Sequence, residues 1–244
     1  PAGRGLVLTE AGQAALQQAD LIFQLGEALP AIVRDAVSTP AVRLAVGICN
    51  GLPKLVVHRL LLPVIAEPNL RLVCHEGELD DLLGDLALHR LDIVLSDRPA
   101  PVNPNIKLYS HAMDSSTIGW YGTSALVQAA SADFPQSLGD IPVLLPTAHT
   151  AMRDRIDKWF EQRGIRPRIV GEFADGALLK TFGASGMGVF PAAEWVHDDL
   201  QAHYAVQRLG PCEGVIEHFF AIGTEKKVHH PLVLRLLQPA PQAT

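Results

Sequence analysis

A seven-residue repeat of apolar positions opens the chain, and a second row of small or apolar residues follows it four places later. The first row is Leu8, Ala15, Ile22, Leu29 and Ala36, and the second is Gly12, Ala19, Gly26 and Val33. Positions three, four and seven apart share one face of a helix, so the pattern predicts a long helix over residues 9–40 with Thr9 as its N-cap. Such a stripe either packs on the chain's own core or pairs with a second copy. We favour dimerisation, because the stripe precedes the first α/β element and its small residues allow a partner helix to approach closely.

After residue 40 the pattern changes to short apolar runs that alternate with amphipathic segments. It predicts strands at 42–48, 70–76 and 92–97, separated by helices near 51–62 and at 79–89. This βαβαβ order is typical of a parallel sheet covered by helices.

A second series of the same kind follows a proline-rich connector at residues 99–105. The predicted elements are strands at 117–122, 142–146, 168–173 and 188–191, helices at 151–163 and 176–183, and a tail strand at 217–224 followed by a helix at 230–238. The fold class is therefore α/β, with two Rossmann-like lobes of the periplasmic-binding-protein type joined by a two-stranded hinge, preceded by the long helix.

The predicted domain boundaries follow from this order. Lobe I comprises residues 41–110 and 216–244, because the tail returns to complete it, and lobe II comprises residues 111–215. The chain crosses between the lobes near 109–118 and near 206–217, and these crossings are the expected hinge.

Composition narrows the classes of function. The net charge is −6 with no dense cluster of Lys or Arg, so this chain by itself is expected to bind nucleic acid poorly. The three cysteines show no metal-binding spacing, and no signal peptide precedes them, which favours a reducing cytoplasm. No apolar run is long enough to cross a bilayer, so no membrane partner is expected.

Polar residues follow the predicted strands of both lobes, where open α/β sheets bind ligands beyond the carboxyl ends of their strands. The candidate ligand-binding residues are Cys49, Asn50 and Asp97 in the first series and Thr147, His149, Thr150, Glu172, Asp175 and Phe190 in the second. Any one of the polar residues at a helix start could simply cap its helix. Their convergence on one crevice is the reason to hypothesise a binding role.

Catalysis has weaker support. The sequence has no nucleophile elbow and no phosphate-binding P-loop. The stretch GASGMG at 183–188 follows a helix and leads into a strand, which is the reverse of a dinucleotide fingerprint. We therefore predict no enzyme, no catalytic residues and no cofactor, and assign no metal site.

The stretch LVLTEAGQ at residues 6–13 resembles the end of the DNA-binding wing and the start of the linker helix in LysR-type transcriptional regulators, where L-T-x-A-G recurs. The resemblance covers the whole chain. It implies an upstream winged helix-turn-helix that binds DNA, a homodimer or homotetramer built on the linker helix, and RNA polymerase as a candidate partner. It also makes residues 1–8 the remnant of the wing, with Arg4 as a DNA contact, and residues 9–40 the dimerising linker with Leu8, Ala15, Ile22, Leu29 and Val33 on its stripe.

Two segments, at 88–99 and 141–184, look closer still to the NhaR-like branch, whose members activate sodium/proton antiporter genes in response to sodium. The leading interpretation is a cytoplasmic activator whose effector binds between the lobes. The alternative is a solute-binding receptor of the periplasmic type, which would need a signal peptide. Helix starts favour an anionic effector such as a small carboxylate, whereas Asp97, Glu172 and Asp175 favour a cation. The branch resemblance favours sodium.

Overall fold

The computed structural model describes residues 41–102, 107–148, 150–225 and 230–238, together with a series of positions in the lead segment. Those positions are Thr9, Ala11, Gly12, Ala15, Leu16, Ala19, Ile22, Phe23, Gly26, Glu27 and Pro30. Several predicted residues lie outside the described part: Arg4, Leu8, Leu29, Val33, Ala36 and His149.

The described residues of the lead segment from Ala11 to Pro30 are helical, as the repeat predicts. The Gly12 N–H donates to Thr9 Oγ1 at 3.2 Å, so Thr9 caps the helix. Ile22 and Phe23 are 69% and 70% exposed in the single chain, and Leu16 is exposed as well. These side chains are therefore not buried against the described part of the chain.

Lobe I is built on a parallel sheet in which β1 (Val42–Cys49) pairs with β2 (Leu70–Gly77) and with β3 (Ile93–Ser96). Its helices are α2 (Lys54–Ile65), α3 (Leu79–Ala87) and α8 (Pro231–Leu237). Side chains alternate along β1, so that Leu44 and Val46 join the core beneath α2 and α8, whereas Ala45 joins the core beneath α3. Both faces of β1 are thus covered from Leu44 to Cys49, which explains why no polar side chain interrupts this stretch.

Lobe II contains the parallel pair β5 (Pro142–Pro146) and β6 (Arg168–Phe173), and the short strand β7 (Phe190–Ala193). Its helices are α4 (Ser124–Ala130), α5 (Ala151–Arg163), α6 (Gly176–Ala184) and α7 (His197–Tyr204). Trp120 packs against Trp159 and Phe160 of α5, with ring centroids 6.0 and 5.5 Å apart, at the centre of this lobe. The sequence pattern did not predict α4 or α7.

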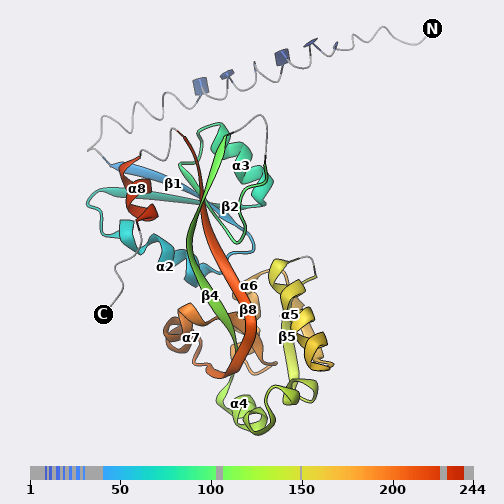
Figure 1. Cartoon of the computed structure of the whole chain (residues 1–244). Coiled ribbons are helices and arrows are strands. Elements are labelled where there is room, and N and C mark those ends of the chain that lie inside the picture. Colours follow the sequence, from blue (N-terminus) through green and yellow to red (C-terminus); the bar gives the residue numbers. More distant parts are fainter. Residues whose placement is uncertain are drawn as a thin grey trace, which may run out of the picture.

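The two lobes are joined by a ribbon of two long antiparallel strands, β4 (Leu108–Gly122) and β8 (Gln207–Thr224), which runs from one lobe into the other (Figure 1). The ribbon completes a sheet of order β2-β1-β3-β8-β4-β7. Its register shifts between Ala112 and Asp114 and again between Thr117 and Ile118. Such irregularities bend and twist a strand pair locally. Both strands are much longer than predicted. The expected hinge segment 109–118 lies within β4, and the segment 206–217 lies within β8 except for residue 206. The division into lobes at residues 110 and 216 stays a prediction.

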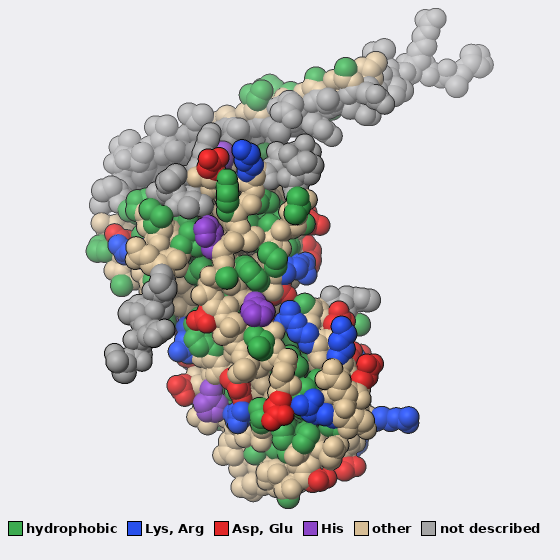
Figure 2. Space-filling view, in the orientation of Figure 1, with side chains coloured by type: hydrophobic (Ala, Val, Ile, Leu, Met, Phe, Trp, Pro, Cys, Tyr) green, Lys and Arg blue, Asp and Glu red, His purple; other side chains and the backbone are tan. Residues whose placement is uncertain are grey.

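Charge on the surface is mixed. In the face shown in Figure 2, acidic and basic side chains are interspersed over both lobes, with no large basic area among the residues drawn in colour. None of the described helices is long and apolar enough to cross a membrane.

Candidate ligand-binding site between the lobes

Two neighbouring cavities lie where the lobes face each other. The outer cavity has a volume of about 470 Å³ and is lined by residues that include Cys49, Glu76, Glu78, Arg98 and Thr147. The inner cavity has a volume of about 70 Å³ and is lined by residues that include Leu52, Phe173, Lys180, Pro191 and Glu217. Residues lining both are Asn50, Gly51, Lys54, Asp97, Thr150, Ala174 and Asp175. The two cavities are therefore compartments of one cleft.

The topology explains why the cleft forms here. In lobe I, Asn50 follows β1 and Asp97 follows β3, and both strands end at the same edge of the parallel sheet. In lobe II, Thr147 follows β5 and Asp175 follows β6 at the corresponding edge. Since parallel strands present their carboxyl ends together, each lobe contributes one wall of polar residues.

Six of the residues predicted from the sequence line the cleft: Cys49, Asn50, Asp97, Thr147, Thr150 and Asp175. Glu172 does not line either cavity; its carboxylate is instead paired with Arg153, which also binds Asp157. Phe190 is fully buried, with its ring close to Gly183 and stacked on Tyr121 at 6.3 Å, and it likewise lines neither cavity.

Two of the lining residues cap helices, which is the structural role that a polar residue at a helix start was expected to have if it does not bind a ligand. Thr150 Oγ1 accepts from the Arg153 N–H at 3.2 Å, and Asp175 Oδ1 accepts from the N–H groups of Ala177 and Leu178 at 2.9 and 2.7 Å. Both side chains are thus already engaged where they face the cleft.

Asn50 does not begin a helix, contrary to prediction. Helix α2 begins four residues later, at Lys54, because Pro53 occupies the N-cap position with an extended backbone. The Asn50 side chain instead donates to Glu78 Oε1 at 2.8 Å. Next to it, burial raises the pKa of the Cys49 thiol, so this side chain is a neutral wall of the cleft and not a thiolate.

Two buried charged residues of the inner cavity were not predicted from the sequence. Lys180 of α6 is 5% exposed and Glu217 of β8 is 3% exposed. For Glu217, the alternation of side chains along the strand indicates burial, because Glu217 lies on the same strand face as the buried Phe219 and Ala221. For Lys180, the sequence gives no clear indication of burial. It lies one residue from the buried Leu179 and four from Gly176, on a helix so short that its polar face cannot be assigned from the pattern.

Burial changes the protonation of both groups. It raises the pKa of Glu217 to about 8, with Asp97 acting in the same direction and Lys180 and Arg155 opposing. It lowers the pKa of Lys180 to about 8, against the attraction of Glu217 and Asp175, and Lys54 lowers it further. Near neutral pH, Glu217 therefore retains its proton to a large extent.

The outer cavity contains an ion pair. Lys54 Nζ lies 2.5 Å from Glu76 Oε2, and both side chains are partly exposed to solvent. Nowhere in the described part of the chain do three or more His, Cys, Asp or Glu side chains gather in a way that could hold a metal ion.

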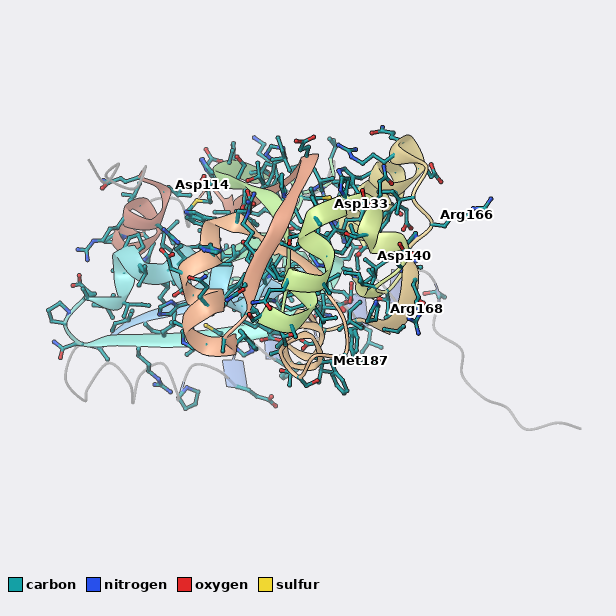
Figure 3. All side chains as sticks on the ribbon, turned by 90° about the horizontal axis from the view of Figure 1, so that it is seen from below. Asp114, Asp133, Asp140, Arg166, Arg168 and Met187 are labelled. Atoms are coloured by element: carbon teal, nitrogen blue, oxygen red, sulfur yellow. The ribbon has the colours of Figure 1, made fainter. Side chains whose placement is uncertain are left out.

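Charged residues at the far end of lobe II do not contribute to the cleft. Asp133, Asp140, Arg166 and Arg168 are labelled in Figure 3, where the Arg166 side chain projects away from the body of the lobe, and none of the four lines either cavity. The charges that matter for a bound molecule are thus those on the two cleft walls and the ribbon.

Comparison with known protein families gives a match over residues 51–241 to the LysR substrate binding domain. Among curated proteins, the chain is similar to the transcriptional activator protein NhaR of Escherichia coli (strain K12), with 29% identity over 235 residues, covering 96% of this chain and 77% of that protein. It is also similar to the nitrogen assimilation regulatory protein nac of the same strain, with 27% identity over 188 residues, covering 76% of this chain and 60% of that protein.

Solved structures show the same fold. Full-length CbnR complexed with its target DNA matches with a TM-score of 0.65 and 19% identity, covering 96% of this chain and 82% of that chain. The effector binding domain of QuiR in complex with shikimate matches with a TM-score of 0.54 and 13% identity, covering 80% of this chain and 93% of that chain.

Proposed function

The chain belongs to the LysR substrate-binding domain family, and from this premise we propose that it is the effector-sensing, dimerising part of a DNA-binding transcriptional activator. The observation that carries the proposal is the cleft between the lobes, in which charged side chains from both lobes and from the ribbon surround one cavity, and two of them, Lys180 and Glu217, are buried. The similarity to the transcriptional activator NhaR supports transcriptional activation, and the similarity to the regulatory protein nac supports a regulatory role. No similarity described above favours the solute-binding receptor.

The cleft couples a ligand to the arrangement of the lobes. Asp97 comes from lobe I, Lys180 from lobe II and Glu217 from the ribbon, so a ligand that contacts all three binds best in one relative position of the lobes. A ligand shifts a conformational equilibrium only through such a difference in affinity. Change in lobe closure is then the proposed signal to the DNA-binding part.

A second contact spans the lobes behind the inner cavity. The Arg59 guanidinium of α2 lies 5.0 Å from the centroid of the Trp195 ring and donates to the Trp195 carbonyl. Trp195 in turn stacks on Phe219 of β8 at 5.7 Å. A displacement of α2 would therefore reach the ribbon directly.

The proposed partners follow the family resemblance. DNA is bound through a winged helix-turn-helix joined ahead of Thr9, with Arg4 as a contact from the wing. The protein acts as a homodimer or homotetramer in the cytoplasm, RNA polymerase is a candidate partner, and a sodium/proton antiporter gene is a candidate target.

Dimerisation is tested at the exposed helix positions Ile22 and Phe23. Replacing both by Asp is expected to weaken dimerisation at least tenfold, because two apolar side chains that would be buried against the partner become charged. This change costs about 2 kcal/mol or more of the dimerisation free energy. Sedimentation velocity at micromolar concentration measures the effect, with Glu27→Gln on the same helix as the control. A wild-type chain that sediments as a monomer at these concentrations contradicts the proposed dimer.

Transcriptional activation is tested with a chimera in which residues 9–244 follow the DNA-binding segment of Escherichia coli NhaR, with a reporter behind a promoter that NhaR activates. We expect transcription at least about fivefold above that of the DNA-binding segment alone, the lower end of common allosteric coupling. A chimera that is folded and dimeric but leaves transcription at the level of the segment alone would overturn the proposed function.

The effector candidates from the sequence are a sodium ion and a small carboxylate. Two of the three acids invoked for a cation are already engaged, since Glu172 pairs with Arg153 and Asp175 caps α6. Lys180, which the sequence did not predict, adds a positive charge to the same cavity. Neither candidate alone matches this set of charges.

A further inference from the structure

The inner cavity brings together opposite charges that do not meet. Lys180 and Glu217 are both almost completely buried and line it together with Asp97. The Lys180 ammonium donates to the Gly176 carbonyl at 2.9 Å, and within the described part of the chain it forms no ion pair with either acid. Donors and acceptors thus face one small space from different sides of it.

The acceptors on one side have no donor. Asp97 Oδ1 and Glu217 Oε2 are buried and, among the described residues, have no hydrogen-bond partner. Buried acceptors without a partner are unusual, because each loses its bonds to water without replacement. Asp97 Oδ1 therefore calls for a donor, and the largely protonated carboxyl group of Glu217 calls for a hydrogen-bond partner, and the described residues supply neither.

The other charged groups that line the inner cavity are engaged elsewhere. Asp175 accepts from the backbone at the start of α6, and Lys54 pairs with Glu76. In the inner cavity, the charged groups that remain available to a ligand are the ammonium group of Lys180 and the carboxyl groups of Asp97 and Glu217.

Apolar side chains form the remaining walls of the inner cavity. They include Leu52, Met152, Phe173, Pro191 and Val196. Such walls suit the carbon atoms of an organic molecule and strengthen its interactions with the charged groups, because they keep water and its high dielectric constant away. A hydrated metal ion would gain nothing from them.

We infer that the inner cavity binds a small zwitterion of the amino-acid class, whose ammonium group donates to Asp97 and to the unprotonated carboxyl oxygen of Glu217 and whose carboxylate accepts from Lys180. The inference rests on the proposed function of the cleft as the effector site and names the class of its ligand. An inorganic cation would leave Lys180 facing a like charge, and a simple carboxylate would face Asp97. A zwitterion places opposite charges at both ends.

The protonation of the residues that line the inner cavity is consistent with a zwitterionic ligand. With the proton largely retained on Glu217, the charges of Asp97 and Lys180 balance each other near neutral pH. A ligand with no net charge preserves that balance, whereas either ion alone would leave an uncompensated charge in a buried site.

The test uses the 244-residue chain, calorimetry and thermal melting. The probes are the twenty standard amino acids and, for the one that binds best, the carboxylic acid that lacks its amino group and the amine that lacks its carboxylate. Sodium chloride is compared with choline chloride at equal ionic strength. We expect saturable binding of at least one amino acid, with both truncated analogues weaker by about tenfold or more, because each leaves a buried charged group unpaired.

Matched variants locate the site. Lys180→Met and Glu217→Gln are each expected to weaken binding of the amino acid about tenfold or more, whereas Lys158→Met and Glu213→Gln, at exposed positions outside both cavities, leave it unchanged. The comparison of analogues on the wild-type chain stands even if a variant fails to fold.

Three results would overturn the inference. They are no binding by any of the twenty amino acids, equal binding of the amino acid and a truncated analogue, and binding that persists in both cavity variants. If sodium or the plain carboxylate binds instead and Lys180→Met or Glu217→Gln abolishes it, the cleft remains an effector site and only the ligand class is wrong. Failure of the proposed function itself is read separately, from the reporter chimera.

Discussion

Between pH 5 and pH 8, the free energy of unfolding of the Glu217→Gln variant is expected to fall less than that of the wild type, by on the order of 2–4 kcal/mol. The reason is the buried position of this carboxyl group on β8, 3% exposed and close to Asp97, which raises its pKa to about 8 from an ordinary value of 4.5. Gln has a similar shape and no proton to lose, so it removes this dependence on pH.

The direction follows from proton binding. In the unfolded chain Glu217 ionises near pH 4.5, whereas in the folded chain it keeps its proton until about pH 8. Between these values folding takes up a proton, so the free energy of unfolding falls as the pH rises through the window. The contribution is fully present below pH 4.5 and is lost above pH 8. Lys180, with its pKa lowered to about 8, acts with the opposite slope, but between pH 8 and its ordinary value of 10.5.

Urea unfolding at pH 5, 6, 7 and 8 measures the effect, and the comparison is the difference in slope between the two proteins. Glu213→Gln is the matched control, because its carboxylate is exposed on the surface and pairs with Arg163. Equal slopes for wild type and Glu217→Gln would show that this carboxyl group is ionised in the folded chain at neutral pH.

Replacing Gly183 with Ala is expected to destabilise the chain by about 2 kcal/mol, although Ala is the better helix former. A Cβ atom at this position would lie 2.1 Å from Cδ1 of Phe190, whose ring is fully buried and stacked on Tyr121. The ring cannot move aside without disturbing the core of lobe II. Since Gly183 lies on α6 one turn after Lys180, the substitution is also expected to displace the cleft wall.

A second glycine gives the control. Gly84 in the middle of α3 has no atom within 4 Å of a Cβ built on it, so Gly84→Ala should stabilise the chain by about 0.5–1 kcal/mol. Combining Gly183→Ala with Phe190→Leu tests the contact itself, since the smaller side chain makes room for the methyl group. Additive effects of these two substitutions in denaturant unfolding would show that the contact with Phe190 is not the cause.

The elements that the sequence predicted most accurately are those with strong local signals. Strand β5, helix α5 and strand β6 have the predicted bounds of 142–146, 151–163 and 168–173. Helix α5 begins after the Thr150 cap and ends at Gly164, whose φ of 64° favours glycine. Both ends are therefore determined by the residue next to the helix. The alternation of apolar runs likewise determined the α/β class and the ends of strands at which the cleft forms.

The long strands of the ribbon could be predicted only in part. The pattern indicated only 117–122 and 217–224, whereas β4 and β8 begin at residues 108 and 207. The remaining halves carry polar residues such as Ser110 and Asp114 and have no apolar alternation. They are strands because they pair with each other along their length, and pairing between segments a hundred residues apart is a property of the tertiary structure.

The sequence by itself determined which residue types stand at the strand ends. It predicted one cleft bordered by residues that include Asn50, Asp97, Thr147, Thr150 and Asp175, and these five line the two cavities. Only the tertiary structure decided which of them have open polar atoms, because a cap or an ion pair uses the same atoms as a ligand contact. It also decided the burial of Lys180 and Glu217, which a sequence pattern assigns to solvent because isolated charges are costly to bury. Here the packing of α6 against the ribbon removes them from water, and this change of environment gives the inner cavity its opposed charges.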